Sequence, residues 1–181
     1  MKRTLIPSTV TNRDDDGLPG LLGPTIRGWA PGNTLTLVSG TVYAYRIYPR
    51  RDYSIALAWF ITSTASGTDD PLEIAVFNDT LGTKVATTGS TTGKLNSTGE
   101  KTATLSVSLT ARTPYIVTFL ATSTATVRST NLNSSAVSSA FGTTAATLLA
   151  WNKASQTIPL STGLSSLTQT NVVPLICLRE S

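Results

Sequence analysis

Hydrophobic and polar residues alternate strictly over residues 102–109, and the pattern changes at residue 115. One side of the first segment is apolar and the other is Thr or Ser, which is typical of a strand with one buried face. Residues 115–121 are apolar or β-branched at nearly every position, as in a strand covered on both faces. Residues 110–114 carry turn chemistry. We expect residues 102–121 to form an antiparallel hairpin at the centre of a β-sandwich.

Short apolar runs separated by turn residues continue through the rest of the chain from residue 34. The pattern predicts strands that include residues 35–37, 42–48, 53–61, 72–77, 83–88 and 171–178. In residues 53–61 we expect one buried face, formed by Tyr53, Ile55, Leu57, Trp59 and Ile61. We expect residues 121–170 to form long loops with one or two short strands and at most one helical turn. Pro174 predicts an edge position or a bulge for the last strand.

Strands at short, regular spacing predict an all-β fold, an antiparallel β-sandwich of jelly-roll type over residues 34–181. Residues 1–33 differ from the rest, because they combine a basic start, an acidic triplet at residues 14–16 and several Gly and Pro. We interpret them as an extended N-terminal arm, with an unstructured terminus as the alternative. The arm carries apolar residues that are candidates for binding a partner subunit: Leu5, Ile6, Leu18, Leu21, Leu22, Ile26 and Trp29.

Residues 17–25 of the arm read as three Gly-X-Y triplets. A collagen triple helix needs Gly at every third position, but three triplets are too few to be stable alone. The segment predicts a Gly- and Pro-rich linker, with a seed for threefold assembly as the alternative.

Composition points away from a highly charged cytosolic enzyme. Charged residues make up 13% of the chain and hydrophobic residues 40%, and abundant Thr and Ser supply the remaining polarity. This balance is typical of extracellular β-proteins and virion surface proteins. The net charge of +4 does not by itself indicate a nucleic-acid partner. We expect no membrane insertion, and no secretory leader is recognisable, so release within an assembled particle is the expected route.

Catalytic chemistry has few residues to use. The absence of His excludes His-based triads and His metal sites within this chain. No phosphate-binding loop, dinucleotide fingerprint or nucleophile elbow occurs, and no cofactor is expected. Glu73, Asp79 and Glu100 are isolated in sequence and are interpreted as solvated turn residues. Calcium at Asp69 and Asp70, or at residues 14–16, is an alternative without the spacing of a known loop. We therefore expect a protein that is not an enzyme.

Three further features of the sequence bear on binding. The single Cys177 lies in an apolar run and is predicted to be a buried hydrophobe. Most Tyr and Trp residues are predicted core, with sugar stacking or a subunit interface as the alternative. Arg50 and Arg51 in a turn are candidates for contact with an acidic glycan or a partner, although a solvated turn is the default interpretation.

Four segments resemble a known family. Residues 41–47 (TVYAYRI), residues 74–83 (IAVFNDTLGT), the pair 98–102 (TGEKT) and 113–117 (TPYIV), and residues 171–178 (NVVPLICL) are similar to the jelly-roll domain of actinobacterial phage minor tail and virion structural proteins. The resemblance implies a virion location, other virion proteins as partners, a homo-oligomer that we expect to be a trimer, and no catalytic residues. It implies a minor tail or tail-tip protein attached through its N-terminal arm. A capsid decoration protein is the alternative because the arm is short, and a module that binds host cell-wall glycan is a further one.

Overall fold

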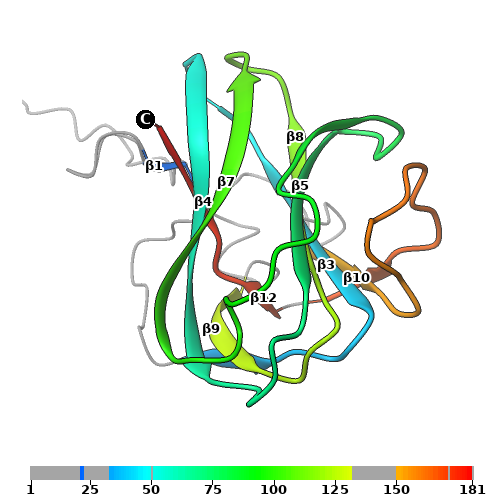
Figure 1. Cartoon of the computed structure of the whole chain (residues 1–181). Coiled ribbons are helices and arrows are strands. Elements are labelled where there is room, and N and C mark those ends of the chain that lie inside the picture. Colours follow the sequence, from blue (N-terminus) through cyan, green and yellow to red (C-terminus); the bar gives the residue numbers. More distant parts are fainter. Residues whose placement is uncertain (1–20, 23–32, 50, 132–149, 171, 181) are drawn as a thin grey trace, which may run out of the picture.

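The chain folds into two antiparallel sheets that pack face to face (Figure 1). The computed structural model describes residues 21–22, 33–49, 51–131, 150–170 and 172–180, and this part contains strands and no helix. Sheet I contains β1 (Leu21–Leu22), β13 (Cys177–Glu180), β4 (Tyr53–Thr64), β9 (Thr126–Asn131) and β12 (Val172–Pro174) in that order, with β2 (Thr34–Thr36) on β9 and β7 (Gly99–Leu109) on β4. Sheet II has the order β11 (Thr168–Gln169), β10 (Ala150–Lys153), β3 (Thr41–Ile47), β8 (Tyr115–Ala121), β5 (Leu72–Asn78) and β6 (Lys84–Thr87).

The strand pairing has the form of a long hairpin that has been rolled up. β3 pairs with β8, β4 with β7, and β5 with β6, all antiparallel, while the chain passes back and forth between the two sheets. This arrangement is that of a jelly roll, which confirms the predicted all-β sandwich.

The predicted hairpin over residues 102–121 is wrong. β7 pairs with β4 in sheet I, whereas β8 lies between β3 and β5 in sheet II. Residues 110–114 cross from one sheet to the other, and the Ala111 N–H donates to Asp52 Oδ1 over 2.7 Å at the crossing. The hydrophobic pattern predicted correctly which faces of β7 and β8 are buried. The two strands belong to different sheets, however, and they contact the interior between the sheets from opposite sides.

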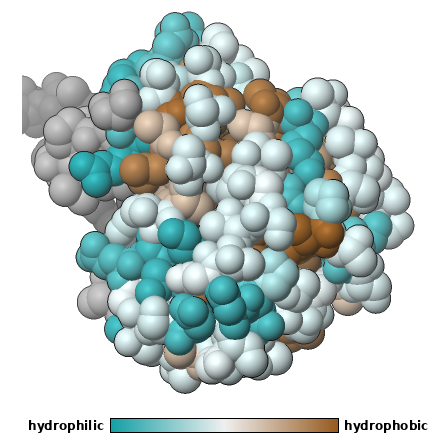
Figure 2. All heavy atoms as spheres, in the orientation of Figure 1, coloured by the Kyte–Doolittle hydropathy of each residue, from teal (hydrophilic) through white to brown (hydrophobic). Residues whose placement is uncertain are grey.

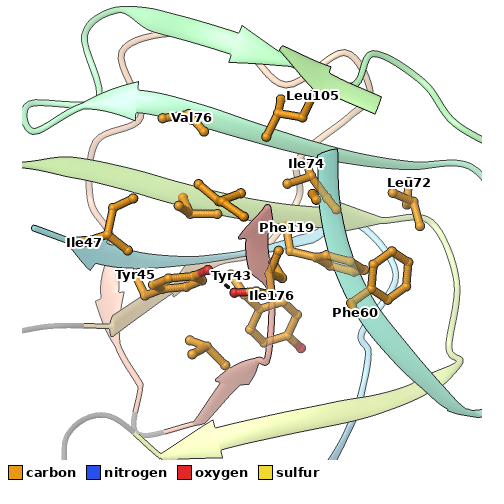
Figure 3. Close-up of a cluster of buried hydrophobic side chains, with 14 of the residues drawn as sticks. Tyr43, Tyr45, Ile47, Phe60, Leu72, Ile74, Val76, Leu105, Phe119 and Ile176 are labelled. Atoms are coloured by element: carbon orange, nitrogen blue, oxygen red, sulfur yellow. Dashed lines mark hydrogen bonds between the residues drawn. The ribbon is translucent and has the colours of Figure 1, made fainter. Parts of the chain in front are cut away.

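Aromatic and aliphatic side chains of both sheets fill the interior (Figure 3). Phe60 of sheet I and Phe119 of sheet II meet edge to face, with ring centroids 5.4 Å apart and planes at 78°. Tyr45 is fully enclosed, and its hydroxyl donates to the carbonyl of Ile176 over 2.7 Å, which links sheet II to the chain between β12 and β13. The prediction that most aromatic residues belong to the core holds for these side chains.

A second apolar cluster lies on the outer face of sheet II. Residues 154–167 fold back over this face, as the loop at the right of Figure 1 shows, and they contribute Leu160 and Leu164. These side chains pack with Val42, Ala44, Ala75, Phe77, Leu81, Ile116, Leu120 and Trp151. The central strands of sheet II are therefore covered on both faces, which explains why β3, β5 and β8 lack polar alternation.

A bulge in β4 overturns the predicted single buried face of residues 53–61. Ile55 pairs with Val107, but Leu57 pairs with Thr104, so the register shifts by one residue. After the shift the inward positions are Ala58 and Phe60, which are fully buried. Leu57, Trp59 and Ile61 consequently lie half-buried on the other face.

The C-terminal strand is divided in two. β12 lies at an edge of sheet I, where Pro174 pairs with Ser129, and this confirms the predicted edge position. β13 continues alongside β4. Residues 121–170 contain the short strands β9, β10 and β11 within their described part, while residues 132–149 lie outside it.

Candidate functional site

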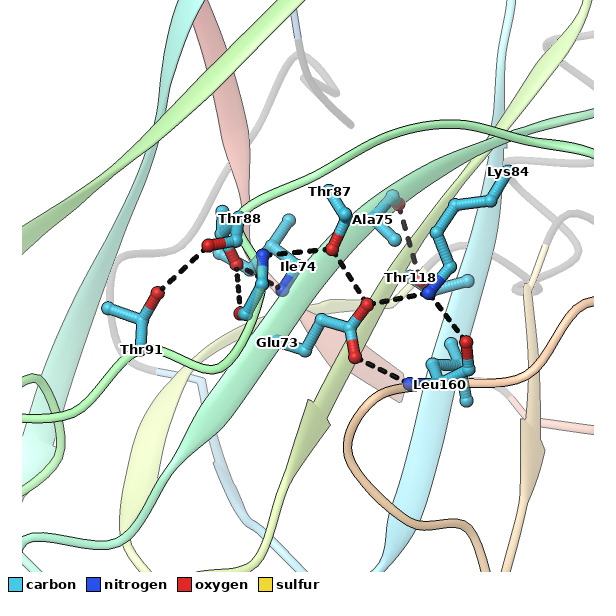
Figure 4. Close-up of polar contacts among 10 residues, drawn as sticks. Glu73, Ile74, Ala75, Lys84, Thr87, Thr88, Thr91, Thr118 and Leu160 are labelled. Carbon is cyan, nitrogen blue, oxygen red and sulfur yellow. Dashed lines mark hydrogen bonds and ion pairs between the residues drawn. The ribbon is translucent and has the colours of Figure 1, made fainter.

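Glu73 is the completely buried carboxylate among the described residues, although the sequence analysis interpreted it as solvated. It lies on the outer face of β5, beneath residues 154–167 (Figure 4). Its Oε1 accepts from Lys84 Nζ over 2.8 Å and from the Thr87 hydroxyl over 2.7 Å. Its Oε2 accepts from the Leu160 N–H over 2.5 Å. The prediction of a solvated turn residue is wrong, because a neighbouring strand and a covering loop supply partners that the local sequence does not reveal.

The contacts of Glu73 are those of a structural residue that holds a loop against the sheet, and not those of a catalytic acid. Both carboxylate oxygens are occupied by protein donors, and Lys84 Nζ also donates to the Leu160 carbonyl over 2.5 Å. A general acid or base needs a lone pair or proton directed at a substrate, and these groups are directed at one another. The cluster fastens residues 154–167 to sheet II. The sequence did carry a signal for it: a lone Glu within the otherwise apolar run of residues 72–77 needs a cation if both faces are buried.

A second charged group lies on the same face of sheet II. Arg46 Nε is 2.6 Å from Asp79 Oδ1, and the guanidinium lies 5.4 Å from the centroid of the Trp151 ring. Trp151 is itself buried, with 8% of its surface exposed. Arg46 therefore covers the indole face that a sugar ring would need for stacking. Asp79 lies in the turn after β5 and its side chain is 40% exposed, as the interpretation of a solvated turn residue requires, but unlike an isolated residue it is engaged by a cation.

Arg51 was a candidate for contact with an acidic glycan or a partner. Its guanidinium makes a two-pronged contact with Glu180, at 3.0 Å and 2.7 Å, and lies 4.3 Å from the centroid of the Tyr53 ring. The pair joins the turn before β4 to the end of β13. Arg50, the other candidate, lies outside the described residues.

Two of the apolar arm candidates are placed by the structure. Leu21 and Leu22 form β1, and their backbone pairs with Arg179 and Leu178 of β13 in the same chain. β1 thus attaches the N-terminal region to an edge of sheet I (Figure 1). Leu5, Ile6, Leu18, Ile26 and Trp29 lie outside the described residues, as do residues 14–16 and the Gly-X-Y triplets apart from residues 21–22.

The part of the chain that the structure describes contains no cluster of metal-ligating side chains. No group of three or more Cys, Asp or Glu residues is arranged there to hold a metal ion. Asp69 accepts from the Gly93 N–H and Asp70 from the Thr68 hydroxyl, so both serve loop structure. Cys177 is buried as predicted, and burial raises the pKa of its thiol to about 12. A thiol that stays protonated at neutral pH is a poor nucleophile.

The largest surface feature that sequence reasoning missed is the free side of β7. The strand runs for 11 residues and pairs with β4 on one side, and no described strand pairs with it on the other. Its outward side chains are all exposed: Glu100, Thr102, Thr104, Ser106 and Ser108. Figure 2, which has the orientation of Figure 1, shows a surface of mostly intermediate hydropathy with separate hydrophilic and hydrophobic patches. Alternation predicted the exposed hydroxyls, but the wrong hairpin assignment concealed the free edge.

No protein-family model and no curated protein matches this chain. Within the described residues there is also no helix long and apolar enough to cross a membrane.

Proposed function

We propose that this protein is a structural component of a bacteriophage particle, most specifically a minor tail or tail-tip protein that exposes its jelly-roll domain. The observation that carries the proposal is where the four resembling segments fall. They comprise β3, most of β5 with the turn that follows it, the first residues of β7 and of β8, and β12 with the first two residues of β13. These segments lie in strands of both sheets, so the resemblance extends over the framework of the fold and is not one local motif.

A non-catalytic role agrees with the chemistry of the described residues. The buried carboxylate Glu73 and the partly exposed Asp79 are both paired with cations, and the thiol of Cys177 is buried. The hydroxyl-rich strand surface offers many weak hydrogen-bonding groups, which suit contact with other proteins over an area. Binding of host cell-wall glycan is the less supported alternative. Among the described Trp and Tyr residues, Tyr48 is the most exposed, at 42%.

The N-terminal region is the proposed attachment to the other virion proteins. Since β1 pairs with β13, removal of residues 1–20 leaves every described strand intact. Particles assembled with the truncated chain should lack it, while the isolated truncated chain should unfold at the same temperature as the full chain. Full incorporation of the truncated chain would refute attachment through this region.

A matched pair of variants refines this experiment. Leu5→Asp combined with Ile6→Asp removes two of the candidate apolar contacts, and Ser8→Asp introduces a carboxylate nearby without removing one. We expect the first variant to be lost from particles and the second to be retained. Copy number separates the two particle locations, because a tail protein is present in few copies and a decoration protein in hundreds.

A further inference from the structure

β7 is much longer than the other outer strands of the two sheets in the described part of the chain. The other outer strands in the described part are β1 and β11 with two residues each, β2 and β12 with three, and β6 with four. β12 also ends in Pro174, which cannot donate a hydrogen bond to a neighbouring strand. Short strands and Pro are the usual protection of sheet edges, whereas β7 offers 11 residues.

Charge does not protect β7 either. Natural edge strands are commonly guarded by Lys or other charged residues along their length. Residues 102–111 carry no charge, and the charged side chains lie only at the ends, where Glu100 and Lys101 precede this run and Arg112 follows it. Both Glu100 and Arg112 are exposed. A free strand edge that carries no charge over residues 102–109 is suited to pairing with another strand.

We propose that two copies of this chain associate through β7, antiparallel around a twofold axis at Ser106, so that sheet I becomes continuous across the pair. With this register, Ser106 faces Ser106 of the second copy and Thr104 faces its Ser108. Hydroxyl residues thus lie opposite hydroxyl residues on the outer surface, a favourable cross-strand pairing. On the inner face Leu105 lies opposite Val107 of the second copy, so apolar side chains also meet.

Charge complementarity selects the second copy as the occupant. The same register brings Glu100 of one copy next to the turn that carries Arg112 of the other, and this happens twice because the contact is isologous. The neighbouring Lys101 lies on the opposite side of the strand, where its Nζ donates to the Ser97 hydroxyl over 2.8 Å. Parallel pairing would instead place like charges together. The inference is independent of the proposed function, since it needs only the sequence and accessibility of β7, and it departs from the trimer that the family resemblance implies.

A cysteine at the axis gives the most direct test. Residues directly opposite in an antiparallel pair have Cα atoms about 4.5–5.5 Å apart, which lies within the range that a disulfide spans. In the full chain, Ser106→Cys should oxidise to a covalent dimer, and Thr168→Cys on the exposed strand β11 of sheet II is the matched control and should stay monomeric on a non-reducing gel. Equal crosslinking of the two variants, or none for Ser106→Cys, would overturn the proposal.

A charge-swap experiment measures the contact without a crosslink. The wild-type full chain should have twice the monomer mass by light scattering. Ser106→Lys and Ser106→Asp should each have the monomer mass, because like charges then meet at the axis, and an equimolar mixture of the two should regain the doubled mass. Thr168→Lys should remain dimeric. A wild-type monomer, a trimer, or a Ser106→Lys variant that keeps the doubled mass contradicts association through β7.

Discussion

Lys84 Nζ lies 2.8 Å from Glu73 Oε1, and this largely buried pair connects β6, β5 and the loop of residues 154–167. The side chain of Glu73 is 0% exposed and that of Lys84 is 17% exposed. A charge in such a place depends on its partner, because water cannot replace it. The covering layer of sheet II is therefore held by polar groups as well as by the apolar contacts of Leu160.

Replacing Lys84 by Met should destabilise the fold strongly. The substitution keeps most of the side-chain volume but leaves the Glu73 carboxylate buried without its cation. We expect the free energy of unfolding to fall by about 3 kcal/mol, measured by urea denaturation. Lys94→Met, on the partly buried Lys94 for which no side-chain contact is described, is the control and should change stability by less than about 0.5 kcal/mol. The double variant Glu73→Gln with Lys84→Met should recover part of the lost stability. If the loss in the double variant equals the sum of the losses in the two single variants, the pairing of Glu73 with Lys84 is contradicted.

The hydroxyl of Tyr45 should also contribute measurably. Tyr45→Phe keeps the ring in the core but removes the hydrogen bond to the buried Ile176 carbonyl. Leaving that carbonyl unpaired costs about 1–3 kcal/mol, to be read as a lower urea midpoint. Val38→Ala, at a position that is 58% exposed, serves as the comparison and should have little effect. Equal stability of wild type and Tyr45→Phe would show that the link between sheet II and the β12–β13 chain does not form.

The contact between Phe60 and Phe119 joins the two sheets at the core. Phe119→Ala removes one ring of the edge-to-face pair and leaves a cavity between fully buried neighbours. The expected loss is about 3–5 kcal/mol in the free energy of unfolding. Val85→Ala, at a position that is 44% exposed, is the control and should lie close to wild type. A small effect of Phe119→Ala would mean that the sheets do not pack through these rings.

Cys177 should resist thiol reagents in the folded protein. Burial raises the pKa of its thiol to about 12, so very little thiolate is present near pH 8. An aromatic disulfide reagent should therefore react slowly with the native chain and at once after denaturation in urea. Rapid stoichiometric reaction of the native chain would contradict the buried position in β13.

The same shift makes stability fall at alkaline pH. In the unfolded chain the thiol ionises near its ordinary pKa of 9.0, while in the folded chain it stays protonated up to about 12. Its contribution is complete below pH 9.0 and is lost as the pH rises toward 12, with a slope of about 1.4 kcal/mol per pH unit. Burial likewise raises the pKa of Tyr45, which adds to the loss above pH 10.0. Cys177→Ala should flatten the fall of stability between pH 9.0 and pH 10.0, as urea midpoints across that range would show.

The sequence predicted burial better than it predicted pairing. Alternation in residues 102–109 and its absence in residues 115–121 correctly indicated one covered face for β7 and two for β8. Alternation does not report which strand lies alongside, so a crossing between sheets looked like a hairpin turn. The bulge after Ile55 was also hidden, because no Gly or Pro marks it.

The polar clusters were harder to predict because their partners are distant in sequence. Leu160 donates to Glu73 across 87 residue positions, and Glu180 accepts from Arg51 across 129. Residues 154–167 contain apolar side chains at irregular spacing, since they cover a sheet as a loop without a repeating geometry. Only the closed three-dimensional arrangement shows that they form a layer.

Quantifying this chain in purified phage particles tests the central claim most directly. Mass spectrometry with isotope-labelled peptides of the chain, calibrated against the major capsid protein of the same preparation, gives the number of copies per particle. The account predicts a small, constant copy number that persists through density-gradient purification and detergent washing. Absence of the chain from infectious, gradient-purified particles would contradict the assignment as a virion structural protein.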